Sequence, residues 1–167
     1  VDCLREHGIT PHATLFHWDS PQALEDRYGS WQSREMAEDF AEYATAVVSR
    51  LGDRITSWMT INEIVCFTHL GYGINHLPAH SPGTVVGSLK QVWQTSHHAL
   101  LAHGLGCQAI RAASPVSCKV ALVDNFVPTV PLTETAADIA AAKAAFPLIG
   151  LHGTNGGILI PALTGAY

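Results

Sequence analysis

Two short polar clusters carry the side chains of this sequence that could do chemistry. His17, Trp18 and Asp19 stand together, and Asn62 directly precedes Glu63. A glutamate can donate or accept a proton during a reaction, and histidine and asparagine can form hydrogen bonds with hydroxyl groups. A tryptophan offers a flat apolar face to a pyranose ring. Together these residue types suit a sugar as ligand, with Glu63 as a candidate for acid or base catalysis.

The same residues have simpler explanations when each is taken alone. A glutamate that follows a strand more often caps a helix or forms a salt bridge than catalyses a reaction. A histidine such as His17 is more often structural, and tryptophans usually pack in the core. A metal site has no support from spacing, because H-E-x-x-H is absent and the adjacent His97 and His98 point in different directions on a helix. No G-x-G-x-x-G follows a strand, so a dinucleotide site has no support either.

Both clusters follow segments that we predict to be strands. His12–Phe16 ends before the first cluster and Ser57–Ile61 before the second, and Lys119–Val123 is a third strand, apolar enough to be buried on both faces. Helical spacing of apolar residues predicts helices over Ser33–Leu51, Leu89–Ala113 and Thr135–Ala145. This alternation indicates an α/β fold with parallel strands, whose carboxyl ends form the edge where ligands bind.

Shorter signals complete the organisation. Ser20 before Pro21 predicts a helix N-cap followed by proline at the first helical position, and the residues from Gly71 to Gly83 predict a loop. The opening V-D-C-L-R-E-H resembles the end of a helix already under way, so we expect the N-terminus to be an internal cut. The glycine-rich tail after Pro147 has no clear helical or strand pattern.

Two architectures fit this order of elements, an open doubly wound sheet and part of a (β/α)₈ barrel. A complete barrel takes about 250 residues, so this chain has room for roughly three of the eight βα units. Periodicity alone does not choose between the two architectures.

Composition excludes several classes of function. The 167 residues carry a formal net charge of −5 and no cluster of Lys or Arg, so nucleic acid is not an expected partner. No apolar run approaches the roughly 18 residues of a membrane span, so no membrane association is expected. The four cysteines form no C-x-x-C pair, and we expect them to be buried, reduced thiols. They are Cys3, Cys66, Cys107 and Cys118.

Several long motifs point to one family. They are H-G-I-T-P-H-A-T-L-F-H-W-D-S-P-Q-A-L-E-D-R-Y-G-S-W at His7–Trp31, L-G-D-R-I-T-S-W-M-T-I-N-E at Leu51–Glu63, L-G-Y-G at Leu70–Gly73, P-G at Pro82-Gly83, H-H-A-L-L-A-H-G at His97–Gly104 and K-V-A-L-V-D-N at Lys119–Asn125. In this order and spacing they closely resemble the third to fifth strands of glycoside hydrolase family 1, the β-glucosidases, β-galactosidases and their relatives. The resemblance covers nearly the whole chain and is weakest after Pro147.

The resemblance implies a partial (β/α)₈ TIM barrel, with residues 1–167 as a catalytic domain truncated at both ends. It implies a retaining β-glycosidase for β-linked glucosides or galactosides, in which Glu63 is the general acid/base. Asn62 would bond the sugar 2-hydroxyl, His17 would bond another hydroxyl, and Trp18 would line the same pocket. Asn125 matches a position near the leaving group. No metal or organic cofactor is implied, and the expected partner is a β-glycoside or oligosaccharide.

The sequence departs from the family pattern in several places. Ile64 and Val65 replace the proline and tryptophan of the common N-E-P-W-C, Ser20 stands where leucine is usual, and His80-Ser81 interrupts the usual H-A-P-G. The T-E-N-G segment that holds the family's nucleophile is absent. Retaining hydrolysis needs two carboxyl groups about 5–5.5 Å apart, so we expect this fragment to be inactive alone and to require the remainder of the barrel.

Two alternatives stay open at this point. A 6-phospho-β-glycosidase of the same family would hold its phosphate with residues outside this chain. The alternative from another class is a truncated, non-catalytic sugar-binding or scaffold protein. The unpaired cysteines and the habit of the family indicate a bacterial cytoplasmic protein.

Overall fold

The structure, a computed structural model, describes residues 1–74, 78, 80–149 and 153–166. The chain forms two compact units, Val1–Val123 and Asp124–Tyr167. The elements of the first unit are α1 (Asp2–Glu6), β1 (His12–Phe16), α2 (Gln22–Tyr28), the 3₁₀ helix η1 (Ser30–Gln32), α3 (Glu35–Leu51), β2 (Ser57–Asn62), α4 (Ile64–His69), β3 (Tyr72–Ile74), β4 (Thr84–Val86), α5 (Leu89–Ala113) and β5 (Lys119–Val123).

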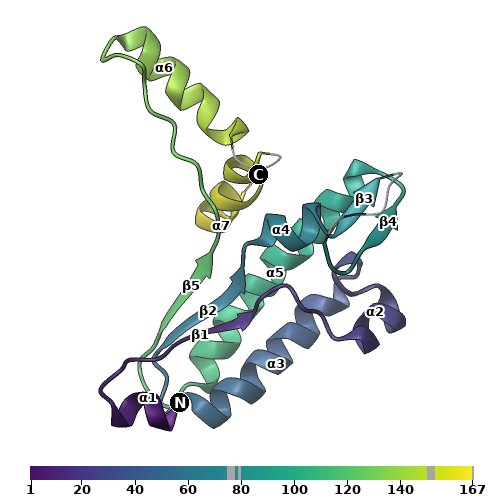
Figure 1. Ribbon diagram of the computed structural model, residues 1–167, viewed down its shortest axis with the longest axis vertical. Helices are drawn as coiled ribbons and strands as arrows, with labels where there is room; N and C mark the ends of the chain where they lie inside the picture. Colours follow the sequence, from purple (N-terminus) through teal and green to yellow (C-terminus); the bar gives the residue numbers. More distant parts are fainter. Residues whose placement is uncertain (75–77, 79, 150–152, 167) are drawn as a thin grey trace. The chain divides into compact units, whose positions relative to one another are not determined.

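A parallel three-stranded sheet in the order β1-β2-β5 forms the centre of the first unit. Its strands begin and end within one residue of the predicted positions, and their parallel pairing with helical crossovers is confirmed. Figure 1 shows α3 and α5 side by side along the sheet, where α5 packs against β2 and β5. The short strands β3 and β4 pair with each other, separately from this sheet.

The packing of α3 on α5 follows from the residues at the helix interface. The buried residues of α3 recur at helical spacing and form one face of the helix. They are Met36, Ala37, Phe40, Ala44 and Val48. The facing side of α5 buries small residues, which let the two helix backbones approach. At Gly106 an added Cβ atom would lie 2.6 Å from Cε1 of Phe40, so this glycine is required by the contact. At Gly104 an added Cβ would meet nothing within 4 Å.

An aromatic cluster fixes the carboxyl end of β1. The ring of Phe16 meets Trp31 edge-on at a centroid distance of 5.0 Å and Phe67 at 4.9 Å, and Trp31 and Phe67 lie 5.1 Å apart. All three side chains are buried. Edge-to-face packing of this kind stabilises a defined arrangement of rings, so the cluster ties β1 to η1 and α4.

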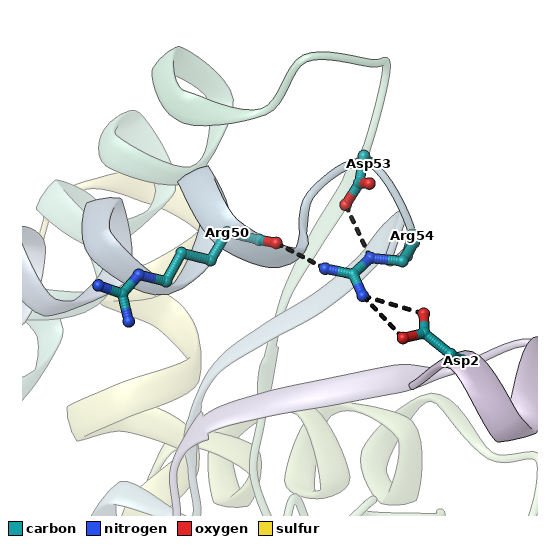
Figure 2. A network of polar contacts seen from close by, with 4 residues as sticks. All are labelled: Asp2, Arg50, Asp53 and Arg54. Atoms are coloured by element: carbon teal, nitrogen blue, oxygen red, sulfur yellow. Dashed lines mark hydrogen bonds and ion pairs between the residues drawn. The ribbon is translucent and has the colours of Figure 1, made fainter.

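The opposite end of the sheet is fixed by an arginine network (Figure 2). Arg54, which lies just before β2, donates from Nη1 to both carboxylate oxygens of Asp2 at 2.9 and 3.1 Å. It also donates from Nε to Asp53 at 3.0 Å and from Nη2 to the carbonyl oxygen of Arg50 at 2.8 Å. The hydrogen bond and charge of Arg54 lower the pKa of the Asp2 carboxyl. The network therefore joins α1 and the end of α3 to the start of β2.

The second unit contains α6 (Ala136–Ala145), the 3₁₀ helix η2 (Phe146–Leu148), the π-helix η3 (Asn155–Leu159) and α7 (Ile160–Thr164). The predicted helix Thr135–Ala145 is confirmed, with Thr135 as its N-cap. Buried Asn155 connects this unit internally. Its amide bonds both the N–H and the carbonyl of Val127 and also the carbonyl of Phe146.

Four predictions require correction. The strand Lys119–Val123 is not buried on both faces, since every residue of β5 is half-buried or exposed. The N-cap of α2 is Pro21, so the helix begins one residue later than Ser20 predicts. Within the predicted Gly71–Gly83 loop, Tyr72–Ile74 forms a strand, since it pairs with β4. The loop residues 75–77 and 79 lie outside the described part of the chain.

The fourth correction concerns the cysteines. All four are free, but Cys3 is exposed and the other three are half-buried. Cys66 and Cys107 lie on α4 and α5, but other side chains of these helices form their buried faces, and Cys3 lies on α1, which has no buried residue. The prediction of buried thiols was therefore wrong about burial.

The two glycines of α5 give a matched test of the helix packing. We expect Gly104→Ala to raise the free energy of unfolding by up to about 1 kcal/mol, because alanine has the higher helix propensity at an open site. Gly106→Ala should lower it by about 1–2 kcal/mol, since overpacking against Phe40 exceeds the propensity gain. Urea denaturation of the purified protein measures both. Equal shifts in the same direction would contradict the contact.

Candidate functional site

The register of β1 and β2 brings the two polar clusters together. Phe16 pairs with Ile61, so the next residues, His17 and Asn62, leave the sheet at the same level. The side-chain Nδ2 of Asn62 lies 3.4 Å from Nε2 of His17. The indole N–H of Trp18 donates to the backbone carbonyl of Asn62 at 3.1 Å. Residues 44 and 45 positions apart in the chain thus meet at the ends of two adjacent strands.

Two residues of this group have a left-handed backbone conformation, which residues other than glycine rarely adopt. Trp18 has φ of 75° and Glu63 has φ of 50°. Among the described residues, Ser30 is the one further non-glycine residue with positive φ. A left-handed conformation costs an L-residue roughly 1–2 kcal/mol. Strained residues persist only where the surrounding structure holds them in place. They are found most often at functional sites.

Glu63 occupies the turn between β2 and α4. Its N–H donates to the carbonyl of Val123 on β5 at 2.7 Å, and its own carbonyl accepts from Cys66 at 2.9 Å. It stands at the N-cap position of α4, but its half-buried side chain does not cap the helix. The backbone therefore holds Glu63 firmly while the carboxylate is not used for capping.

Hydrogen bonds of Thr60 connect β2 to its neighbours α5 and β5. Buried Thr60 lies 2.7 Å from Nδ1 of His103 on α5, and its hydroxyl donates to the carbonyl of Ala121 at 3.3 Å. Burial lowers the pKa of His103, with the charge of Arg111 adding to the effect. A neutral imidazole with its proton on Nδ1 satisfies both bonds of the hydroxyl. These bonds join β2, β5 and α5 three residues before Glu63.

A histidine that sequence reasoning did not select also contacts the group. His80 packs its ring against Trp18 at a centroid distance of 4.7 Å and an interplanar angle of 88°. His17 contacts the same indole at 5.0 Å and 70°. His80 drew attention in the sequence as a departure from the family pattern. Its place in a Gly/Pro/His-rich loop after Glu63 was the available signal.

Asn125 is a member of the second unit. It is exposed, and its backbone N–H donates to the side chain of Asp124 at 2.8 Å. Its expected place near a leaving group stays a prediction.

A pocket of about 230 Å³ has Asp19 of the first cluster in its wall. Apolar side chains of β1, α2 and α3 line it together with Asp19, Asp39 and Tyr43. His17, Trp18, Asn62 and Glu63 are not in its wall, so this cavity is separate from the candidate site.

In the part of the chain that the structure describes, no group of three or more His, Cys, Asp and Glu side chains could hold a metal ion. None of the helices in those same residues combines the length and the apolar character needed to cross a membrane.

Comparison with known proteins identifies the family. The sequence pattern of glycosyl hydrolase family 1 matches residues 1–167. The chain is 38% identical to a β-glucosidase of Agrobacterium sp. The match covers all of this chain and 34% of that relative. The chain is 39% identical to a cyanidin 3-O-glucoside 7-O-glucosyltransferase (acyl-glucose) of Delphinium grandiflorum, over 87% of this chain and 30% of the relative. The chain thus spans about a third of the length of these relatives.

Solved structures give the same result. Virulence factor SghA from Agrobacterium tumefaciens superposes with a TM-score of 0.78 at 37% identity, over 99% of this chain and 34% of SghA. A second structure of SghA contains its substrate analog salicin and superposes with a TM-score of 0.74 at 37% identity, over 96% of this chain and 33% of that one. These matches confirm the predicted partial barrel and decide against the open doubly wound sheet. The chain therefore belongs to glycosyl hydrolase family 1, and it is a β-glucosidase-like part of that family's (β/α)₈ barrel.

Proposed function

We propose that this chain is part of a retaining β-glycosidase in which Glu63 is the general acid/base and His17, Trp18 and Asn62 bind the sugar. The observation that carries the proposal is the meeting of both polar clusters at the adjacent ends of β1 and β2. The positive φ angles of Trp18 and Glu63 at that edge add support. The longer protein that completes the barrel is called the parent enzyme below.

The reaction needs two carboxyl groups, of which this chain supplies one. Glu63 donates its proton to the glycosidic oxygen while a carboxylate outside the chain attacks the anomeric carbon and forms a glycosyl-enzyme. Glu63, now ionised, removes a proton from water, and the water oxygen displaces the carboxylate and releases the sugar. The two carboxyl groups must be about 5–5.5 Å apart, so the remainder of the barrel is required.

The contacts within the site leave different groups of Trp18, Asn62 and His17 available to a sugar. The indole N–H of Trp18 is bonded to the Asn62 carbonyl, so this residue offers the sugar its ring surface. Asn62 donates from Nδ2 toward His17, which leaves the amide oxygen to accept from a hydroxyl. The second ring nitrogen of His17, which is exposed in this chain, remains for another hydroxyl.

A β-glucoside is the substrate class that the relatives favour, since they include a β-glucosidase and a structure with salicin as substrate analog. Residues 1–167 would then form one part of a single catalytic domain, with Asn125 near the leaving group. The free cysteines favour a reducing compartment such as the bacterial cytoplasm.

The proposed role of Glu63 predicts the effect of Glu63→Ala in the parent enzyme. Substrates with alkoxide leaving groups should lose about 10²–10⁴-fold in kcat/KM, because these groups need a proton in the transition state. Nitrophenyl β-glucosides should keep their glycosylation step, and azide should restore turnover with a β-glycosyl azide as product. Steady-state kinetics and NMR of the product measure both effects. Glu38→Ala, which removes an exposed carboxylate from α3, is the control.

Three outcomes separate the possible roles of Glu63. An α-glycosyl azide would mean that Glu63 is the nucleophile, since azide would then attack the free anomeric centre. Equal losses for both substrate classes together with a large fall in melting temperature would mean that it is structural. Either result would overturn the assignment.

A chain of these 167 residues alone should show no glycosidase activity, because it lacks a second carboxylate for the displacement. The measurement is hydrolysis of an aryl β-glucoside by the purified protein, and mixing with the remaining part of the barrel is the positive control. Steady turnover by the contaminant-free chain alone would show that another carboxylate within it acts as nucleophile.

Trp18→Ala in the parent enzyme should weaken sugar binding more than it lowers stability. Trp18 is half-buried at a strand end, so the substitution removes contact surface for the sugar and little core. We expect about a tenfold loss of affinity, or ~1.4 kcal/mol, with a change of only a few degrees in melting temperature. Titration with a glucoside measures the first and thermal denaturation the second. Trp93→Ala, which removes a half-buried tryptophan that packs edge-on against His69, is the matched control. Normal binding with an early melt would contradict the prediction.

A further inference from the structure

The side chain of Trp18 needs outside support to keep one orientation. Its positive φ of 75° is a strained backbone state, and its indole is tied to β2 by a single hydrogen bond to the Asn62 carbonyl. A single hydrogen bond contributes little net stability to one orientation of a side chain. Contacts on the ring itself therefore add to what holds the indole of Trp18 in place.

His80 supplies such a contact from an element distant in sequence. Its ring meets the indole at 4.7 Å and 88°, within the range of favourable edge-to-face packing. His17 also touches the indole, but it follows β1 directly, is exposed and shares the strained turn with Trp18. His80 is the contact that does not depend on that turn.

The backbone on both sides of the His80 contact is held in place. The N–H of His80 donates to the carbonyl of Leu70 at 3.0 Å, and the carbonyl of Gly71 accepts from Gly83 at 3.1 Å and from Thr84 at 3.0 Å. An added Cβ at Gly71 would lie 2.5 Å from the carbonyl oxygen of Ser81, so the loop packs directly on the end of α4. Since α4 begins next to Glu63, this anchoring connects the His80 ring to the acid/base turn.

The polar chemistry of His80 is not what the contact uses. Its Nδ1 is buried and has no hydrogen-bond partner among the described residues. A buried polar atom without a partner destabilises a fold, so the shape and edge of the ring, rather than this nitrogen, explain the contact.

We propose that His80 is a positioning residue that holds the indole of Trp18 in its sugar-binding orientation through ring-edge contact. This inference rests on the proposed function and adds to it a residue outside the two clusters. His80, which lies between β3 and β4, would then support the sugar site. The ring of His80, and not its charge, would hold the indole.

Two substitutions in the parent enzyme test the proposal. His80→Ala removes the ring and should raise KM for a 4-nitrophenyl β-glucoside about fivefold, with kcat little changed, because ground-state and transition-state binding are lost equally. His80→Phe keeps a flat ring and should restore KM to within about twofold of the original value, and removal of the unpaired nitrogen should leave the melting temperature equal or higher. His12→Ala, at the exposed other end of β1, is the control.

The outcomes assign the role of His80 independently of Glu63. Wild-type KM for His80→Ala would overturn the positioning role, and so would a raised KM for His80→Phe equal to that of His80→Ala. A fall in kcat without a change in KM would likewise exclude positioning through binding. The azide experiment on Glu63 decides the proposed function separately, so a failure there is distinguishable from a failure at His80.

Discussion

The candidate site depends on the in-register parallel pairing of β1 and β2. Because His12 pairs with Ser57 and Phe16 with Ile61, the residues that follow the two strands reach the same edge at the same height. A shift of one residue would turn every side chain of a strand to the opposite face. The contacts of Trp18 and His17 with Asn62 exist only in this register.

Packing at both ends of the sheet maintains that register. At the carboxyl end, the buried rings of Phe16, Trp31 and Phe67 link β1 to the helix that begins after Glu63. At the amino end, Arg54 joins the start of β2 to α1 (Figure 2). Between them, Thr60 and His103 connect the middle of β2 to α5. The polar site is thus carried by contacts that involve no sugar-binding residue.

Much of this arrangement follows from sequence patterns. The apolar runs His12–Phe16 and Lys119–Val123 predict their strands to the residue, and the 3.6-residue periodicity of Leu89–Ala113 predicts its helix in full. The partial exposure of β5 did not follow, because its apolar composition suits a strand that is buried on both faces. The short α4 did not follow either, since a single turn and a half has too few residues to show a period.

The site shows the same division. His17, Trp18, Asn62 and Glu63 stand out because strand ends concentrate ligand-binding residues, and family motifs give them roles. His80 did not stand out, because its contact with Trp18 spans more than sixty residues of chain and runs through a loop without regular pattern. The left-handed φ angles of Trp18 and Glu63 are also invisible in a sequence, since neither residue type favours them.

The strain at Trp18 and Glu63 has an evolutionary consequence. Glycine and asparagine adopt a left-handed backbone with less penalty, so a chain released from selection for sugar chemistry would gain stability by exchanging either residue. In a relative that is still selected to stay folded but not to act on sugars, these two side chains would be replaced before those of the core. An inventory of natural variants at the two positions would distinguish a lineage under functional selection from one selected only to stay folded, without any enzyme assay.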